Sequence, residues 1–583
     1  MTHSLRLSAS ATALGLALLA APQARAQGFN ANPVVITPGI TIVRSPGVDT
    51  IRVGTAQGII NWINTDLPAP VIDFLPAGNS ANFVNEGVAD FVVLNRIQMR
   101  DPATVARFAG TVTSRLTTGG APSPGGTLWF YSPGGILVAN GAVFDVGSLL
   151  LTANQPVVFD TDGDGTPDSL FGPSGEIQLR SLRNDSRAAV VVEQNAQFSA
   201  PREGSYIAMV APRIDMRGQV RVNGSAAYVA AEDLDITISA GLFDFSIIEG
   251  SFVDPTIAGD DETLRYAGAT GGPSSTGAGD NHVTYLVAMP KNEAVTMLVT
   301  GSLGYDAASG AVVENGVIYL SAGGFSDQTT DIVRAPGQTI SPASDPPGSI
   351  EISTVNVTSR LQAFATDSIF VRNGGSATSI YAEGAAFYAG NTITLLTESK
   401  GAHVFGGDAL FAANNGVGGS FTFTGESDST TDIDGNFLVD VGDNSEGGGA
   451  PALGGNLALA LDVADLLVGG DIVLDARGVG VFINAVAEGR GGLITVDAQA
   501  LSAISAANFT ADATGIGAGT SGQAADGFGG QVTISADNST IDVAGLARAV
   551  ADGIGGNGGD VGAGDGIGGD VSLASLDGAA MTV

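Results

Sequence analysis

The 583-residue sequence contains no cysteine. Small exported domains are often held together by disulfides, so a chain without them needs a large continuous core. Basic residues are also scarce, since 24 lysines and arginines stand against 59 aspartates and glutamates, a formal net charge of −35. A surface of that sign repels phosphate backbones, which excludes nucleic acid as a partner. It offers carboxylates to divalent cations, although an acidic coat that keeps the protein in solution explains most of the charge.

Motifs for catalysis are missing as well. The sequence has no G-x-S-x-G, H-E-x-x-H or P-loop pattern, and neither His282 nor His403 lies near a nucleophile motif. The main enzymatic alternative is a secreted polysaccharide lyase or hydrolase that carries carboxylates on a lateral cleft. Carboxylate pairs occur at residues 232–233 and 260–261, but solvated turns explain them more simply. We therefore expect a protein that is not an enzyme.

Long hydrophobic runs are confined to the amino terminus. Residues 7–21 are apolar and rich in small side chains, and no other run approaches the ~20 residues that a membrane-spanning helix needs. Arg6 precedes this run and Ala24-Arg25-Ala26 follows it. This order predicts a secretory signal peptide, residues 1–26, that is cleaved between Ala26 and Gln27.

The remaining sequence favours short β-strands. Aromatic residues make up only 6% of the chain, whereas glycine accounts for 84 residues and hydrophobic residues for 44%, which is too apolar for an acidic disordered chain. Segments rich in β-branched residues are bounded by Gly, Asn, Asp and Pro, as strands and turns are. Residues 452–467 are apolar and ambiguous, but a glycine pair weakens a helix there. The sequence therefore predicts an all-β fold.

A degenerate repeat runs through the carboxyl-terminal part. A glycine pair followed by an alternating strand begins at Gly418, Gly454, Gly469, Gly491, Gly529 and Gly568, with spacings of 36, 15, 22, 38 and 39 residues. We interpret the long spacings as two rungs each, because residues 539–543 supply an extra strand between two of the repeats. Rungs of ~22 residues predict about 25 coils and a rod of about 120 Å. A β-sandwich, the main alternative, would show closely spaced hairpin turns instead.

One stretch resembles a known family. Seven segments follow one another in a characteristic order: GIINW from Gly58, VIDF from Val71, LNRI from Leu94, AGTV from Ala109, WFYSPGGI from Trp129, NGAVFDVGSL from Asn140 and GSYIA from Gly204. This succession is similar to the haemagglutination-activity domain of two-partner secretion exoproteins, the filamentous haemagglutinin family. The resemblance covers roughly a third of the chain.

The resemblance implies a fold, a partner and a location. It implies a right-handed parallel β-helix with extra-helical loops and hairpins, exported through the periplasm of a Gram-negative cell by an outer-membrane β-barrel transporter with POTRA domains. The implied role is an adhesin on the cell surface or outside the cell. An autotransporter passenger is the other alternative, and the sequence lacks the amphipathic barrel strands that it would need.

A turn in this stretch is a candidate for recognition by the transporter. Ser132, Pro133, Gly134, Gly135 and Ile136 occupy the place of an Asn-Pro-Asn-Gly-Ile turn of the family. Proline and glycine preserve the turn geometry, but the asparagine side chains are absent, and no second copy of the family's Asn-Pro-Asn-Leu turn is evident. A purely structural corner is the alternative interpretation.

A candidate calcium loop lies between two strands of the same region. Asp160, Asp162, Asp164, Thr166 and Asp168 occupy loop positions 1, 3, 5, 7 and 9, with Gly at position 6. Phe171 stands where an EF-hand has glutamate, so the pattern is closer to short extracellular aspartate loops; an acidic hairpin tip is the alternative. Residues 555–560 (GGNGGD) approach a calcium nonapeptide, but a flexible glycine loop is the simpler interpretation.

Composition shifts predict four parts. These are the signal peptide (1–26), the secretion domain (27–250), a β-rich extension with exposed loops and a Pro-rich linker (251–348) and the degenerate β-helix repeats (349–583). The linker, residues 334–348, concentrates Pro, Ser and Gly.

Overall fold

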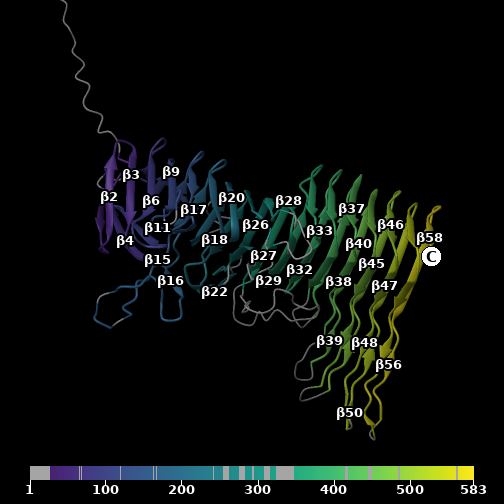
Figure 1. The fold of residues 1–583 in the computed structure, drawn as a ribbon. Coiled ribbons are helices and arrows are strands. Elements are labelled where there is room, and N and C mark those ends of the chain that lie inside the picture. The colour runs from purple at the N-terminus through teal and green to yellow at the C-terminus, as the bar shows by residue number, and fades with distance from the viewer. Residues whose placement is uncertain are drawn as a thin grey trace, which may run out of the picture.

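The computed structural model describes residues 27–583 except 65, 67–68, 118–119, 162, 166, 240–241, 254–261, 275–281, 292–293, 307–315, 324–346, 414–417, 444–449, 483–485, 521 and 560–561. Every regular element of these residues is a β-strand, and most strands pair in parallel with strands of the next coil. The predicted parallel β-helix is thereby confirmed (Figure 1). No helix among the described residues is long and apolar enough to cross a membrane. The predicted signal peptide, including Ala26, lies outside the described residues, which begin at Gln27.

Each coil passes through three strands, which we assign in chain order to faces A, B and C. The strands form because inward apolar residues alternate with outward polar or small ones. In β40 (Asn456–Asp462), Leu457, Leu459 and Leu461 are buried and the residues between them face outward. Leu457 lies in register with Ile494 of the next coil. Stacking of this kind creates one continuous column of buried side chains along the molecule.

The faces are long parallel sheets. Face A is built from β4 (Gln57–Ile63), β7 (Val92–Gln98), β11 (Thr127–Tyr131), β14 (Ser148–Thr152), the second halves of β18 (Gln197–Ala211) and β20 (Gln219–Ala230), β25 (Val283–Ala288), β27 (Val317–Ala322), β29 (Arg360–Ala365), β32 (Ala385–Ala389), β35 (Ala409–Ala413), β38 (Phe437–Asp440), β42 (Ile472–Asp475), β47 (Phe509–Asp512) and β54 (Ala547–Val550). Face B is built from β5 (Val71–Leu75), β8 (Val105–Phe108), β12 (Ile136–Val138), β17 (Ala189–Val192), β19 (Arg213–Met216), β23 (Leu264–Tyr266), the first halves of β26 (Ala294–Leu303) and β28 (Gly348–Val357), β30 (Ser368–Arg372), β33 (Thr392–Thr397), β36 (Ser420–Gly425), β40, β45 (Leu493–Gln499), β52 (Gln531–Asp537) and β57 (Asp570–Leu576). Face C is built from β3 (Val48–Val53), β6 (Ser80–Asn85), β9 (Thr111–Leu116), β13 (Val143–Asp145), the remaining halves of β18, β20, β26 and β28, β24 (Ala269–Gly271), β31 (Thr378–Tyr381), β34 (Ala402–Phe405), β37 (Ser429–Ile433), β41 (Ala464–Val468), β46 (Ala503–Ala506), β53 (Thr540–Val543) and β58 (Ala580–Thr582).

The predicted coil length is wrong. Strands that begin 36–39 residues apart pair directly, as Asn456 does with Leu493 and Gln531 with Asp570, so each long spacing is a single coil. The extra strand at residues 539–543 is β53, which forms face C of the same coil rather than a second rung. Within the described residues face A holds the fifteen strands named above, not about 25. At ~4.8 Å per coil the stack is about 70 Å long.

The amino-terminal end of the stack is capped. β1 (Asn32–Val35) and β2 (Ile40–Ser45) pair antiparallel with β4 and β3 at this end, while β10 (Ser123–Pro124) pairs antiparallel with β9 in a later coil. Phe29 is fully buried, and its ring lies 4.6 Å from those of Trp62 and Phe74. The buried Asp49 carboxylate accepts hydrogen bonds from the Phe29 amide (2.9 Å) and from Arg44 Nε (3.0 Å). These contacts close the first coil and shield the core from water.

The corner between faces A and B carries the long insertions. Two of them contribute an antiparallel sheet of β15 (Gln155–Pro156), β16 (Ile177–Arg180), β21 (Asp233–Ser239) and β22 (Leu242–Glu249), seen beside the coils in Figure 1. Its apolar side chains, such as Leu179 and Ile236, form a second hydrophobic cluster with Trp129 and Leu150 on the outside of face A. The predicted extra-helical hairpins therefore pack as a second layer.

The last coils extend at the same corner into a thin fin (Figure 1). One of its sheets is built from β39 (Ala452–Leu453), β44 (Gly489–Arg490), β51 (Gly527–Phe528) and β56 (Gly566–Ile567), the other from β43 (Gly478–Val479), β48 (Gly515–Ile516) and β55 (Gly553–Ile554), and β49 (Gly519–Thr520) and β50 (Gln523–Ala524) form a hairpin. The two sheets meet through glycine. A Cβ on Gly515, for example, would lie 1.9 Å from the Phe528 carbonyl oxygen, so only glycine allows this approach.

The extension at residues 251–348 contributes coils as well as connections. Residues 254–281 include a Gly- and Ser-rich segment that favours an exposed loop, but β23 and β24 lie within them and pair with β19 and β20. The residues that flank them, 254–261 and 275–281, lie outside the described residues, as does most of the Pro-rich linker.

Candidate functional site

The turn of Ser132, Pro133, Gly134, Gly135 and Ile136 lies at the corner between faces A and B, where β11 ends and β12 begins. The Gly135 amide donates to the Ser132 carbonyl at 3.0 Å, and Gly135 has a positive φ of 103°. A Cβ on Gly134 would lie 2.2 Å from the Thr104 carbonyl oxygen of the preceding coil. The backbone of the turn is therefore determined by packing between neighbouring coils, and its recognition by a transporter remains a prediction.

The asparagine of the LNRI segment has a structural role inside the core. Asn95 is fully buried on β7, and its Oδ1 accepts a hydrogen bond from Trp62 Nε1 at 3.0 Å. Its amide nitrogen lies 3.3 Å from the Trp129 carbonyl of the next coil. One side chain thus links three successive coils and satisfies an indole N–H that has no access to water.

We expect Asn95→Ala to lower the unfolding free energy by about 2 kcal/mol, because it orphans the Trp62 indole N–H and leaves a cavity. Thermal unfolding followed by Trp fluorescence measures the change, and Asn140→Ala on the surface is the control. Equal midpoints for the two variants would contradict the assigned role.

The calcium loop is only partly described, because Asp162 and Thr166 lie outside the described residues. The Asp160 carboxylate accepts hydrogen bonds from the amides of Gly163 and Gly165, both at 2.7 Å. Hydrogen bonds from the hydroxyl and amide of Thr161 lower the pKa of Asp168. Among the described residues no three His, Cys, Asp or Glu side chains are grouped so that they could hold a metal ion. Calcium binding by Asp160, Asp162, Asp164, Thr166 and Asp168 therefore stays a prediction.

Calcium should bind with half-saturation between about 0.1 and 1 mM, as in extracellular modules. Trp129 gives a convenient signal, because its ring packs 5.4 Å from that of Phe171, three residues beyond the loop. We expect calcium, but not magnesium, to change Trp fluorescence in the parent and not in Asp160→Asn/Asp164→Asn. Asp462→Asn is the surface control, and an identical response in all three proteins would refute the site.

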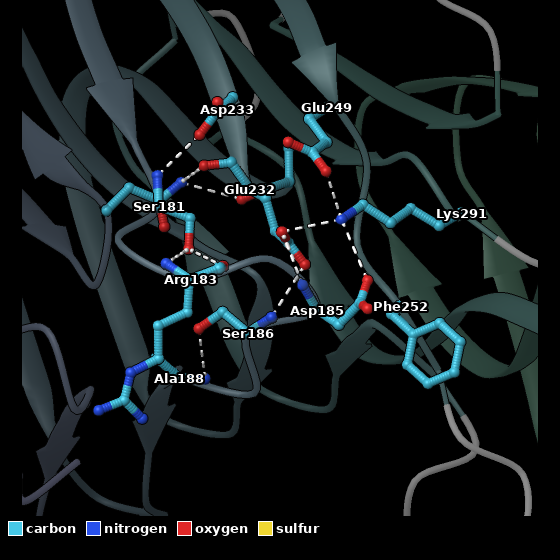
Figure 2. A network of polar contacts seen from close by, with 12 residues as sticks. Ser181, Arg183, Asp185, Ser186, Ala188, Glu232, Asp233, Glu249, Phe252 and Lys291 are labelled. Atoms are coloured by element: carbon cyan, nitrogen blue, oxygen red, sulfur yellow. Dashed lines mark hydrogen bonds and ion pairs between the residues drawn. The ribbon is translucent and has the colours of Figure 1, made fainter.

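A cluster of three carboxylates surrounds Lys291, one of the two lysines of the chain (Figure 2). Lys291 Nζ lies 2.6 Å from Glu249, 2.9 Å from Glu232 and 3.3 Å from Asp185. Glu249 ends β22, Glu232 immediately precedes β21, and Asp185 lies between β16 and β17. The cluster therefore ties the outer sheet to the coils.

Glu232 is the buried member of the cluster. Its side chain is 1% exposed and accepts hydrogen bonds from the amides of Asp185 (3.1 Å) and Ser186 (3.0 Å). Burial raises the pKa of Glu232, and the contact with Lys291 opposes that shift. Burial lowers the pKa of Lys291, but its bonds to Glu249 and Glu232 outweigh burial, so that its pKa is raised overall. Lys291 is thus held as a cation and cannot serve as a general base.

The carboxylate pair at residues 232–233 is therefore not a solvated turn, and that interpretation is wrong for Glu232. Its neighbour Asp233 accepts a hydrogen bond from the Ser181 amide at 2.7 Å (Figure 2). Local sequence carries no signal for Lys291 or Glu249 as partners, because they follow 59 and 17 residues later along the chain. The other carboxylate pair, at residues 260–261, lies outside the described residues.

The two histidines of the described residues are buried. His403 lies among the aromatic rings of Tyr381 and Phe405, and burial lowers its pKa to about 4. Its Nε2 lies 3.1 Å from the Leu396 carbonyl. A neutral imidazole inside the column of coils packs as a core residue and is not accessible to a substrate.

A ladder of aspartates lies on consecutive coils of face A. Asp440 is in register with Asp475, and Asp475 with Asp512. Burial and, secondly, the charge of Asp475 raise the pKa of Asp440 to about 6, although Arg477 and the Gly442 amide oppose the shift.

The raised pKa of Asp440 predicts a pH-dependent stability. The pKa of Asp440 in the folded protein lies above the unfolded value of about 3.9. The contribution of this group to folding stability is therefore fully present below pH 4 and is lost as the pH rises through 6. We expect Asp440→Asn to stabilise the protein by about 1 kcal/mol at pH 7.5, with partial exposure allowed for, and to have little effect at pH 4. Thermal unfolding at both pH values measures this, with the exposed Asp432→Asn as control; an equal gain at both values would contradict it.

Solved structures similar to this chain include two secretion domains. The secretion domain of HMW1 from Haemophilus influenzae is 12% identical, and the match covers 89% of this chain and 99% of that one with a TM-score of 0.37. The filamentous hemagglutinin secretion domain is 13% identical, with 75% and 100% covered and a TM-score of 0.26. No family model matches the chain, and no curated protein matches it. Both structures are secretion domains, the class that the order of segments resembles, while the fold rests on the strand pairing described above.

Proposed function

We propose that this chain is an exoprotein exported by two-partner secretion, with an adhesin-like role outside the cell or on its surface and without catalytic activity. Its partner is an outer-membrane β-barrel transporter with POTRA domains, reached through the periplasm after cleavage of the signal peptide. The amino-terminal coils are the secretion domain, and the remaining coils carry exposed loops away from it.

The observation that carries this proposal is the position of the family-like segments. GIINW and LNRI lie on β4 and β7, and WFYSPGGI begins on β11, so all three start on the same face of three consecutive coils. VIDF lies on β5, AGTV leads into β9 and VFDVGSL spans β13 and β14. The order in the sequence is therefore the order of coils from the capped end, as expected for a domain that folds coil by coil.

The experiment is secretion of the full chain from a host with and without a two-partner transporter taken from the source genome. We expect the mature protein in the medium only when the transporter is present, while a periplasmic enzyme stays inside as a leakage control. Export without any transporter would overturn the proposal. Pro133→Ala and Ser132→Ala test the recognition turn, and unchanged export of both would leave it a structural corner.

The adhesive role needs its own assay. Purified mature protein should bind a host, bacterial or matrix surface and should not degrade bacterial or plant polysaccharides. Turnover that is abolished by substituting one carboxylate would favour the enzymatic alternative instead.

A further inference from the structure

A groove of about 530 Å3 lies on the outside of face C. It crosses the coils of β18, β20, β24, β26 and β28, and it lies away from the insertions at the corner between faces A and B. Residues of the proposed secretion turn, the calcium loop and the Lys291 cluster do not line it. The groove is therefore separate from every site discussed above.

The floor of the groove lacks large side chains. In one outward row, Gln219 is followed on the next two coils by Ala269 and Ser302. In the neighbouring row Arg221 is followed by Gly271. A Cβ on Gly271 would lie 2.3 Å from the Gly304 carbonyl oxygen, so close backbone packing requires glycine at position 271. Position 269 already carries the Cβ of an alanine, so its small size is not required by backbone packing. The small residues leave a hollow between bulkier polar residues on either side.

Three side-chain amides border this hollow with their hydrogen-bonding groups unused. Gln197, Gln219 and Asn356 lie in one register row and are exposed. Within the described part of the chain none of the three side chains has a hydrogen-bond partner, whereas most surface arginines of the chain are paired with acids. An amide both donates and accepts, which suits a hydroxyl group better than it suits a charged group.

Charge in the groove is balanced, unlike that of the chain as a whole. Arg221 Nη2 lies 2.6 Å from Asp306 Oδ2, and these are the only charged residues that line the described groove. A neutral ligand is thus neither repelled by the surrounding acidic surface nor in need of a counter-charge. The ~4.8 Å rise between coils is comparable with the length of one pyranose unit, so successive coils can contact successive sugar residues.

We propose that the groove on face C binds a neutral, linear glycan. Gln197, Gln219 and Asn356 bond its hydroxyl groups, Ser302 and the Arg221–Asp306 pair add further contacts, and Ala269 leaves room for the rings. The aromatic residues of the lining, Phe144 and Phe198, are buried. Their rings offer no exposed platform for a sugar, which predicts modest affinity, on the order of 0.1–1 mM per site. This inference deepens the proposed adhesin-like role and rests on it for its biological meaning.

The test uses the full mature chain and an array of neutral linear oligosaccharides built from glucose, galactose, mannose and their N-acetyl forms. A sulfated hexasaccharide serves as the anionic control. Saturation-transfer NMR then measures affinity for each oligosaccharide that the array retains. We expect at least one neutral oligosaccharide to bind, and the anionic one to bind more weakly.

Variants assign the binding to the groove. Ala269→Trp fills the floor and should abolish binding, and Gln219→Ala should weaken it about three- to tenfold through the loss of one or two hydrogen bonds. Ala460→Trp and Gln531→Ala, at outward positions of face B, should bind as the parent does. Unchanged unfolding midpoints show that the variants are folded.

The outcomes separate the two proposals. If the protein binds no oligosaccharide of the array, or if binding persists in Ala269→Trp, the groove site is overturned. This holds even if the protein is exported by its transporter and adheres to surfaces. Glycan binding that depends on the groove in a protein exported without a transporter overturns the secretion proposal and supports the groove.

Discussion

Replacing Lys291 by methionine is expected to lower the unfolding free energy of the coils around it by about 3–5 kcal/mol, because it leaves a buried charge without its partner. Glu232 is 1% exposed, and its remaining partners are two backbone amides. The more exposed Glu249 and Asp185 add little, since water screens their charges. The buried ion pair therefore dominates the effect.

The readout should be local as well as global. Arg183 and Arg187 are exposed in the segment that the cluster holds, so trypsin should cut there faster in Lys291→Met than in the parent. Lys400→Met, at the only other lysine, is the matched control. Adding Glu232→Gln to Lys291→Met removes the unpaired charge and should restore part of the lost stability. A single variant as stable and as resistant as Lys400→Met would contradict the buried pair.

Much of the coil architecture could be predicted because it depends on a local pattern. Alternation in segments such as residues 493–499 gives one buried face directly, and the structure has that alternation in β45. Coil length could not be predicted in the same way. Whether residues 38 apart are one coil or two depends on which strands pair, and Leu493 pairs with Gln531 across a fin that carries no periodic signal. Two-residue strands such as β48 are too short to have a period.

Glycine-rich sequence in the fin suggests a flexible loop, whereas in the structure these glycines allow close packing between backbones. The segment 555–560 reads as a loose loop, but a Cβ on Gly555 would lie 1.9 Å from the Gly564 carbonyl oxygen. Close contact between backbones cannot be distinguished from a flexible linker by composition alone.

The partners of the candidate site residues also could not be predicted from local sequence. The segment LNRI identifies Asn95, but only the register of β4 on β7 explains why an asparagine stands there, beside the indole of Trp62. Glu232 and Asp233 are visible as a carboxylate pair, yet their chemistry is decided by Lys291, which a different coil supplies. The groove on face C arises from small outward residues that are neighbours on adjacent coils but far apart in the sequence, so no sequence motif predicts it.

Substitution of Gly491 by alanine should break the stack at one coil. A Cβ at Gly491 would lie 1.7 Å from the Ala513 carbonyl oxygen and 2.6 Å from the Gly530 amide nitrogen. Both neighbours are backbone atoms of adjoining segments and cannot rotate away, so the coils must separate. The Gly491 amide also donates to the Phe528 carbonyl at 2.8 Å, and that hydrogen bond would lengthen. We expect a loss of about 3 kcal/mol or more, at the upper end for overpacking.

The damage should stay near the substitution, because each coil is stabilised mainly by its neighbours. Thermal unfolding of Gly491→Ala should therefore show an early transition for the carboxyl-terminal coils, while the capped coils with Trp62 and Trp129 keep the fluorescence transition of the parent. Gly568 is the matched control, since it occupies the same place before β57 but a Cβ there would meet nothing within 4 Å. If Gly568→Ala lowered the stability as much as Gly491→Ala, the loss would come from replacing glycine at this position in general and not from contact between coils. If neither variant showed an early unfolding transition, direct backbone packing at the glycine pairs would not be what holds successive coils together.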